Sequence, residues 1–201
     1  MARLSSAQRR AQLVEAAITV MTRDGIAKAT TRAIVAEADV SLSVFHYCFE
    51  SKHALFEAVI EALTEHSESR AMAAVEVSPD ASLRQTVRAS LQAYWDHVVA
   101  HPAEHMLTYE LTQYVLRHPG FEDVAKRQYR QYVRANQRVI EQAQKHYGFE
   151  FVVAKADLAR SLASTLDGLT LNYLVLGNKS SAERVLDSLA DYVVSCVRAA
   201  G

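Results

Sequence analysis

Hydrophobic residues recur at helical spacing through most of the chain, and the first fifty residues contain three such segments. Ser5 and Gln8 form a capping-box pattern that opens the first segment, and Gly25 ends it. Thr30 and Ser41 are each expected to cap a short helix, because a hydroxyl oxygen can accept a hydrogen bond from an otherwise unpaired backbone N–H. The pattern therefore predicts a longer helix followed by two short helices joined by a tight turn.

The remaining pattern predicts six more helices. Ser51 is expected to cap the fourth, which continues toward Ala73. Val77–Asp80 is the only evident connector, and Pro102 suits the first turn of a helix. Because few prolines and glycines interrupt the pattern, the expected fold class is all-α with about nine helices. The later helices are expected at 81–100, 102–117, 121–147, 153–176 and 181–199.

The two short helices of residues 30–47 have the arrangement that lays a second helix in the major groove of DNA. The second helix has serine, histidine and tyrosine at outer positions, which a buried helix does not need. Two short helices also pack together in many all-α proteins that bind no nucleic acid, so the spacing alone leaves that alternative open. Basic side chains near the two helices can neutralise phosphates: Arg3, Arg9, Arg10, Arg32 and Lys52.

The first quarter of the chain resembles the TetR-type (TetR/AcrR) transcriptional regulators. This resemblance implies a three-helix helix-turn-helix DNA-binding domain at 1–52, with the helix at 51–73 as a connector. It also implies that residues 74–201 form a helical ligand-binding and dimerisation domain, and their length and helical pattern suit one. The matched positions are Gly25, Thr30, Arg32, Ile34, Ala38, Val40, Ser41, Phe49, Ser51, Lys52 and Leu55.

Three positions depart from the pattern of the family. Asp39 stands where glycine is usual, so the turn is expected to require a positive φ that aspartate tolerates less well. His46 replaces a usual tyrosine, and Cys48 a usual histidine or tyrosine. These changes concern the base sequence that is read more than the fold. The residues expected to contact DNA are Thr30, Thr31, Arg32, Ser41, Leu42, Ser43, Val44, His46, Tyr47 and Lys52.

Charge and composition agree with a DNA-facing end on a larger body. The formal net charge of the 201 residues is -1, but residues 1–52 carry +2 and the rest carry -3. Cys48 and Cys196 are far apart in the sequence, so a disulfide between them is not expected. No apolar run approaches the roughly 20 residues of a membrane span, and the N-terminus lacks an apolar signal core. The expected location is the cytoplasm.

Aromatic, sulfur-containing and polar residues gather near the middle of the chain and could line a small-molecule pocket. Apolar walls would bind the ligand, and a few polar groups would orient it. The alternative is that the largest of these side chains are simply core. The candidate ligand-binding residues are Trp95, His105, Met106, Tyr109, Glu110, Gln113, Asn172 and Tyr173.

Both of the last two predicted helices are strongly apolar, and the first, at 153–176, is apolar on more than one face, so it needs two partners. One partner is the chain itself, and the other is expected to be the same pair of helices from a second subunit. The alternative is that both faces are internal core. The candidate interface residues are Leu158, Leu162, Leu166, Leu169, Val185, Leu189 and Tyr192.

The resemblance implies a homodimeric, ligand-responsive transcriptional regulator, usually a repressor, that a small-molecule inducer releases from a palindromic operator. A rival hypothesis is a helical metal-binding protein or enzyme using His97, His101 and His105, although Pro102 interrupts their four-residue repeat. A protein scaffold that has lost DNA binding is a third possibility. No catalytic triad, phosphate loop or paired-carboxylate signature is present, so no enzyme activity, cofactor or metal is expected.

Overall fold

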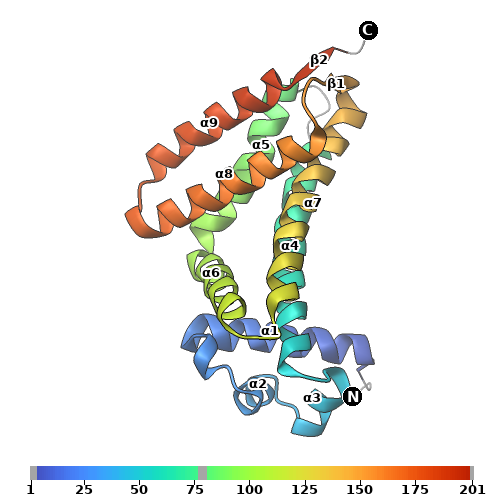
Figure 1. The fold of residues 1–201 in the computed structure, drawn as a ribbon, viewed down its shortest axis with the longest axis vertical. Helices are drawn as coiled ribbons and strands as arrows, with labels where there is room; N and C mark the ends of the chain where they lie inside the picture. The colour runs from blue at the N-terminus through green and yellow to red at the C-terminus, as the bar shows by residue number, and fades with distance from the viewer. Residues whose placement is uncertain (1–3, 77–80, 200–201) are drawn as a thin grey trace. The chain divides into compact units, whose positions relative to one another are not determined.

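The computed structural model describes residues 4–76 and 81–199, which are largely helical (Figure 1). The all-α prediction is confirmed, with nine α-helices in the described part of the chain. The predicted connector Val77–Asp80 lies outside the described residues, as does Arg3. The helices are α1 (Ser6–Asp24), η1, a 3₁₀ turn (Ile26–Lys28), α2 (Thr31–Glu37), α3 (Leu42–Cys48), α4 (Lys52–Glu76), α5 (Leu83–Ala100), α6 (Pro102–Arg117), α7 (Glu122–Tyr147), α8 (Lys155–Leu176) and α9 (Lys179–Ser195).

Local capping signals account for most of the observed helix ends. The Ser5 and Gln8 box is present, with the Gln8 N–H donating to the Ser5 hydroxyl at 3.2 Å and the Ser5 N–H donating to the Gln8 side chain at 2.8 Å. Gly25 ends α1 with a φ of 82°, and Ser51 accepts a hydrogen bond from the Ala54 N–H at the start of α4. These three predictions are confirmed.

A short two-stranded ribbon replaces part of the predicted last helix. Strand β1 (Phe149–Phe151) pairs antiparallel with β2 (Val197–Ala199), so the prediction of a helix as far as residue 199 is wrong. The strands satisfy each other's backbone groups where α9 has ended. Helix α9 also begins earlier than predicted, because the Asn178 side chain accepts a hydrogen bond from the Ser181 N–H and caps it at Lys179.

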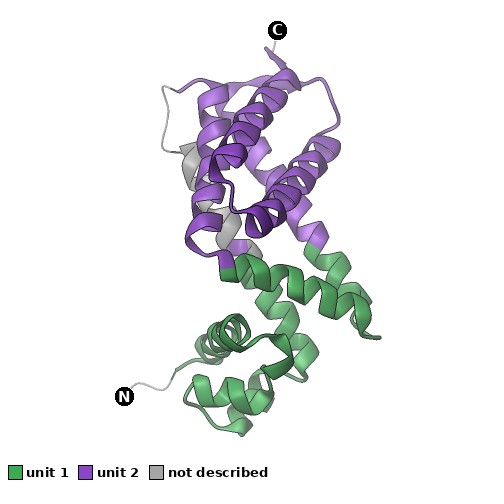
Figure 2. Cartoon of the chain, turned by 90° about the vertical axis from the view of Figure 1, so that its left-hand side faces the viewer, with its two compact units in different colours: residues 1–63, 103–128 green, residues 64–102, 129–201 purple. Residues whose placement is uncertain are grey.

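The chain divides into two compact units (Figure 2). Unit 1 comprises the described residues of 1–63 and 103–128, and unit 2 those of 64–102 and 129–201. The core of unit 1 joins Phe45 and Phe56 to Leu111 of α6, whereas the core of unit 2 contains Trp95 and Leu158. Packing therefore groups residues 103–128 with the N-terminal helices. The predicted functional division, 1–52 and 74–201 joined by 51–73, stays a prediction.

Within the described ranges, no helix combines the length and apolar character needed to cross a membrane.

Candidate nucleic-acid interface and ligand cavity

Helix α3 has one buried and one exposed face. Phe45 is 2% exposed and Phe49, which follows the helix, is 1% exposed, and their ring centroids lie 5.7 Å apart in the core of unit 1. On the other side, Tyr47 is 75% exposed and Leu42 is 42% exposed. Burial of two phenylalanines orients the helix, because each contributes on the order of 1.5–3 kcal/mol when removed from water. The core thus fixes which side chains α3 presents to solvent.

The turn between α2 and α3 is a Schellman motif built around Asp39. Its φ is 50°, which confirms the predicted positive value at a position where glycine is the residue of lowest cost. The N–H of Val40 donates to the carbonyl of Val35 at 3.0 Å, and the N–H of Asp39 donates to that of Ala36 at 3.2 Å. Gln12 of α1 donates its side-chain amide to the neighbouring Ala38 carbonyl at 2.8 Å. The otherwise unpaired C-terminal carbonyls of α2 therefore find partners.

Ser41 does not cap α3 as predicted, and Val44 is partly covered by the core. Ser41 has the extended backbone of an N-cap, but its side chain makes no capping hydrogen bond, so that prediction is wrong. Its hydroxyl lies 2.7 Å from the hydroxyl of Ser43 instead, and both residues are exposed. Val44 is half-buried and packs against the core of unit 1. Much of its apolar surface is thus already covered by the protein.

Two basic residues near α3 lie beside aromatic rings of the protein. Arg10 donates to the Cys48 carbonyl at 2.9 Å, and its guanidinium carbon lies 4.2 Å above the centre of the Phe49 ring. It connects α1 to the end of α3. The Lys52 ammonium lies 5.1 Å from the Phe56 ring centre, and burial lowers the pKa of Lys52.

The remaining candidate DNA contacts lie at the start of α2. Thr30 is exposed and caps the helix, as predicted, by accepting a hydrogen bond from the Ala33 N–H at 3.1 Å. Arg32 is exposed and Thr31 is half-buried. Seven of the ten predicted positions are therefore exposed side chains of unit 1: Thr30, Arg32, Ser41, Leu42, Ser43, His46 and Tyr47.

The predicted ligand-binding residues fall in both compact units. Trp95 is 1% exposed in the core of unit 2, with its ring centroid 5.0 Å from that of Tyr173. The neighbouring Asn172 is exposed. In unit 1, His105 is buried and Tyr109 is half-buried, while Met106, Glu110 and Gln113 are exposed. Core packing therefore explains the burial of Trp95 without a ligand.

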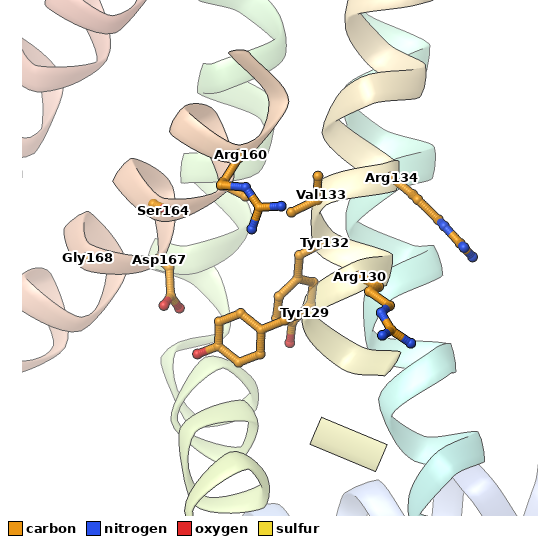
Figure 3. A pocket seen from close by; sticks show the side chains of 10 residues that line it. Tyr129, Arg130, Tyr132, Val133, Arg134, Arg160, Ser164, Asp167 and Gly168 are labelled. Atoms are coloured by element: carbon orange, nitrogen blue, oxygen red, sulfur yellow. The ribbon is translucent and has the colours of Figure 1, made fainter. Parts of the chain in front are cut away.

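A cavity of about 420 Å³ lies in unit 2 between α7 and α8 (Figure 3). None of the eight predicted ligand-binding residues lines it. The sequence pattern did not reveal it because its lining residues come from two separate helices, and Tyr129 of α7 points toward Asp167 of α8 only in the folded chain (Figure 3). The lining residues are Tyr129, Arg130, Tyr132, Val133, Arg134, Arg160, Ala163, Ser164, Asp167 and Gly168.

Hydrogen bonds link α8, which lines this cavity, to two other helices. Tyr129 of α7 is hydrogen-bonded to the carboxylate of Asp167 on α8, and burial together with this carboxylate raises the pKa of Tyr129. The phenol is therefore neutral near pH 7 and donates the hydrogen bond. The Tyr94 and Thr170 hydroxyls lie 2.7 Å apart and join α5 to α8, and burial strongly raises the pKa of Tyr94.

The candidate dimer residues are mostly part of the single-chain core. Leu158, Leu162, Leu166 and Leu189 are all buried in unit 2, so little of their surface remains for a partner. Leu169 and Val185 are half-buried, while Tyr192 is 41% exposed. The exposed apolar side chains near the α8–α9 junction and on α9 are Leu171, Val175, Leu176 and Tyr192.

The three histidines of the rival metal hypothesis do not belong to one unit. The rings of His97 and His101 are neighbours in unit 2, with centroids 4.4 Å apart. His105 is buried in unit 1. The proposed three-histidine set is therefore not a cluster within either unit.

Two family models match the sequence. The C-terminal model of BetI-type transcriptional repressors matches residues 79–198, and the model of the tetR family of bacterial regulatory proteins matches residues 13–59. Among curated proteins, the HTH-type nicotine-responsive transcriptional repressor HdnoR of Paenarthrobacter nicotinovorans is 28% identical over 189 residues. The match covers 94% of this chain and 95% of that protein.

Solved structures share the fold. The multidrug binding protein EbrR, crystallised with imidazole, is 26% identical with a TM-score of 0.62, covering 90% of this chain and 94% of the other. A member of the TetR family from Streptomyces coelicolor A3 is 24% identical with a TM-score of 0.67, covering 90% and 98%. The second comparison supports the fold alone.

Proposed function

The chain belongs to the TetR family of transcriptional regulators, and from this premise we propose that it is a homodimeric repressor whose α3 helices read a palindromic operator. Proteins of this family regulate transcription and are not enzymes. The observation that carries the proposal is the division of α3, in which Phe45 holds the helix in the core while Tyr47 is 75% exposed.

The exposed face of α3 has the chemistry needed for contacts with DNA. Ser43, His46 and Tyr47 supply groups that can hydrogen-bond to base edges or phosphates. Leu42, 42% exposed, supplies an apolar contact suited to a thymine methyl group. Arg32 and the capping hydroxyl of Thr30 are proposed to contact phosphates, which fix the position of the protein without reading sequence. Lys52 also contributes positive charge at the start of α4.

Dimerisation is proposed to use the exposed apolar residues of α8 and α9 rather than the leucines that the core already buries. Val175 is 71% exposed and Leu176 is 67% exposed, and both lie at the end of α8. A second copy could cover the same residues by two-fold symmetry. Two reading helices about 34 Å apart would then enter successive major grooves of a palindromic site.

The Val175→Asp variant tests this contact because it introduces a charge at the proposed interface. It is expected to shift the protein toward monomer in analytical ultracentrifugation.

Release by a small organic molecule is the third part of the proposal. The relative HdnoR is nicotine-responsive, and EbrR is a multidrug binding protein, so an organic effector is supported for this chain. Ligand needs only to bind one of two conformations more tightly, by about 1–3 kcal/mol, to alter DNA affinity 5- to 150-fold. Both the α7–α8 cavity and the residues around Trp95 are candidate sites.

A DNA titration tests the proposal. The duplex is the region upstream of the protein's own gene, with a scrambled duplex of equal length as the control. Lys52→Ala is expected to weaken binding to both duplexes and to reduce the salt dependence, whereas Ser43→Ala changes the preference between them. Leu116→Ala, an exposed site of the same unit outside α3, is the matched control. Equal affinity of the unmodified protein for both duplexes would favour the scaffold hypothesis.

A further inference from the structure

Three polar residues of α8 form a stripe that faces the cavity. Arg160, Ser164 and Asp167 are four and three residues apart, so they lie on one side of the helix. The leucines at 158, 162 and 166 point into the core of unit 2 from a different side. This polar stripe is therefore separate from the leucines of the core and lines the cavity between α7 and α8 (Figure 3).

The stripe has opposite charges at its two ends. Arg160 and Asp167 are seven residues apart, which corresponds to about 10 Å along a helix. The side chains of Arg130 and Arg134 point away from α8, although both residues border the cavity (Figure 3). The cavity therefore offers a carboxylate at one end and a guanidinium at the other.

The opposite wall is aromatic. Tyr129 and Tyr132 of α7 line the cavity beside Val133, so a flat apolar group can lie against rings and a methyl surface. Tyrosine faces also attract cations, by about 0.5–1 kcal/mol at exposed sites. The volume of about 420 Å³ is within the range of small-molecule sites, roughly 300–1,000 Å³.

We propose that this cavity binds an aromatic amine that carries a hydrogen-bond acceptor at the end away from its ammonium group. The ammonium pairs with Asp167, the ring lies against Tyr129 and Tyr132, and the acceptor takes a hydrogen bond from Arg160. This inference rests on the proposed function, since it names the class of effector to which the repressor responds.

An aromatic anion is disfavoured by the same geometry. Its charge would have to lie at the Arg160 end, where the guanidinium is exposed to water and salt. Its ring would then cover the half-buried carboxylate of Asp167 and remove it further from water, and the ligand would bring no positive charge to that carboxylate. The amine instead places its charge at the less exposed end.

Binding would also change a contact between two helices. The Tyr129 hydroxyl donates to Asp167, and an ammonium group competes for the same carboxylate oxygens. Occupancy therefore replaces a direct α7–α8 hydrogen bond by a bridge through the ligand. Tyr129→Phe removes the competing hydroxyl and keeps the ring.

Isothermal titration of the full chain at pH 7 tests the class of ligand. The probes are tyramine, phenethylamine, which lacks the far acceptor, and 3-phenylpropionate, which carries the opposite charge. Tyramine is expected to bind most tightly and 3-phenylpropionate least. Asp167→Asn should lower tyramine affinity at least tenfold, and Arg160→Gln should reduce it to that of phenethylamine. Asp157→Asn, an exposed carboxylate on the same helix, should leave every affinity unchanged.

Several outcomes would overturn the inference: no binding of any probe, equal binding of 3-phenylpropionate and tyramine, or an unaffected Asp167→Asn protein. If Asp167→Asn does not fold, the Tyr129→Phe variant tests the site instead. Equal or tighter binding of tyramine by this variant would support the site, and loss of tyramine binding would contradict it. The same proteins are then titrated with operator DNA. Specific DNA binding without amine binding would reject the proposed ligand class but would still support a DNA-binding regulator. Amine binding without release of DNA would support the site but reject the proposal that a ligand in this cavity releases the operator.

Discussion

Replacing Asp39 by glycine tests whether the turn between α2 and α3 contains backbone strain. At a φ of 50°, the backbone strain of a residue with a Cβ atom destabilises the fold by roughly 1–2 kcal/mol. Aspartate lies near the lower end of this range, and glycine has no such strain. Glycine also increases the freedom of the unfolded chain, which costs about 0.4–1 kcal/mol. Removal of the carboxylate at the C-terminal end of α2 stabilises the folded state by about 0.3 kcal/mol, because the helix dipole disfavours negative charge there. The expected net gain is about 0.5–1 kcal/mol.

Two further variants separate strain from charge. Asp39→Asn removes the charge, and its side chain tolerates the left-handed region, so a gain of about 0.3 kcal/mol that disappears in high salt is expected. Asp39→Ala retains the strain and loses the polar side chain, so it should be less stable than the Asn variant. Glycine should therefore rank first, asparagine second and alanine last of the three.

Native-state hydrogen exchange measures this series directly. The Val40 N–H, which donates to the Val35 carbonyl, reports opening of the turn even if the two units unfold separately. The protection factor of this N–H should rise about two- to fivefold in Asp39→Gly, which corresponds to the stated gain in stability. Slower exchange in Asp39→Ala than in Asp39→Gly would refute the strain argument.

Other contacts give further predictions. Arg10→Ala should lower the free energy of unfolding by about 1–2 kcal/mol in urea titration, because the Cys48 carbonyl loses a charged donor; a loss below 0.3 kcal/mol would contradict this. Arg84 lowers the pKa of Asp191, so the stabilisation is present above the usual aspartate pKa and is lost as the pH falls through the lowered value. The stability difference between Arg84→Ala and the unmodified protein should therefore vanish in acid, and a constant difference would exclude the ion pair. Trp95, the single tryptophan, is 1% exposed and should emit in the blue, and a red-shifted emission from the folded protein would contradict its burial in the core of unit 2.

Local signals in the sequence predicted several helix ends and the exposed face of α3. The Ser5 box, the stop at Gly25 and the strained Asp39 involve residues within a few positions of one another, so spacing reveals them. The serine, histidine and tyrosine expected at outer positions of the second short helix are exposed at Ser43, His46 and Tyr47. The Ser41 cap failed because Ser43 offered its hydroxyl a nearby alternative partner.

Long-range contacts could not be predicted in this way. The ribbon pairs Phe149 with Ala199, and three-residue strands carry too little periodicity to be distinguished from helix ends. The cavity combines Tyr129 and Asp167 from two helices, and spacing within one helix does not show which residues of another helix lie beside it. An apolar helix face does not reveal whether its partner is the same chain or a second copy, which is why leucines such as Leu158 proved to be core.

The measurement that tests the central claim most directly is the ratio of affinities for operator and scrambled duplex, compared between the unmodified protein and Tyr47→Ala. Tyr47 is 75% exposed, so its removal should leave the folded state and the salt dependence unchanged. The account predicts that the preference for operator falls by about 1–3 kcal/mol, roughly 5- to 150-fold. An unchanged ratio, with equal operator affinity for both proteins, would contradict the assignment of α3 as the helix that reads DNA.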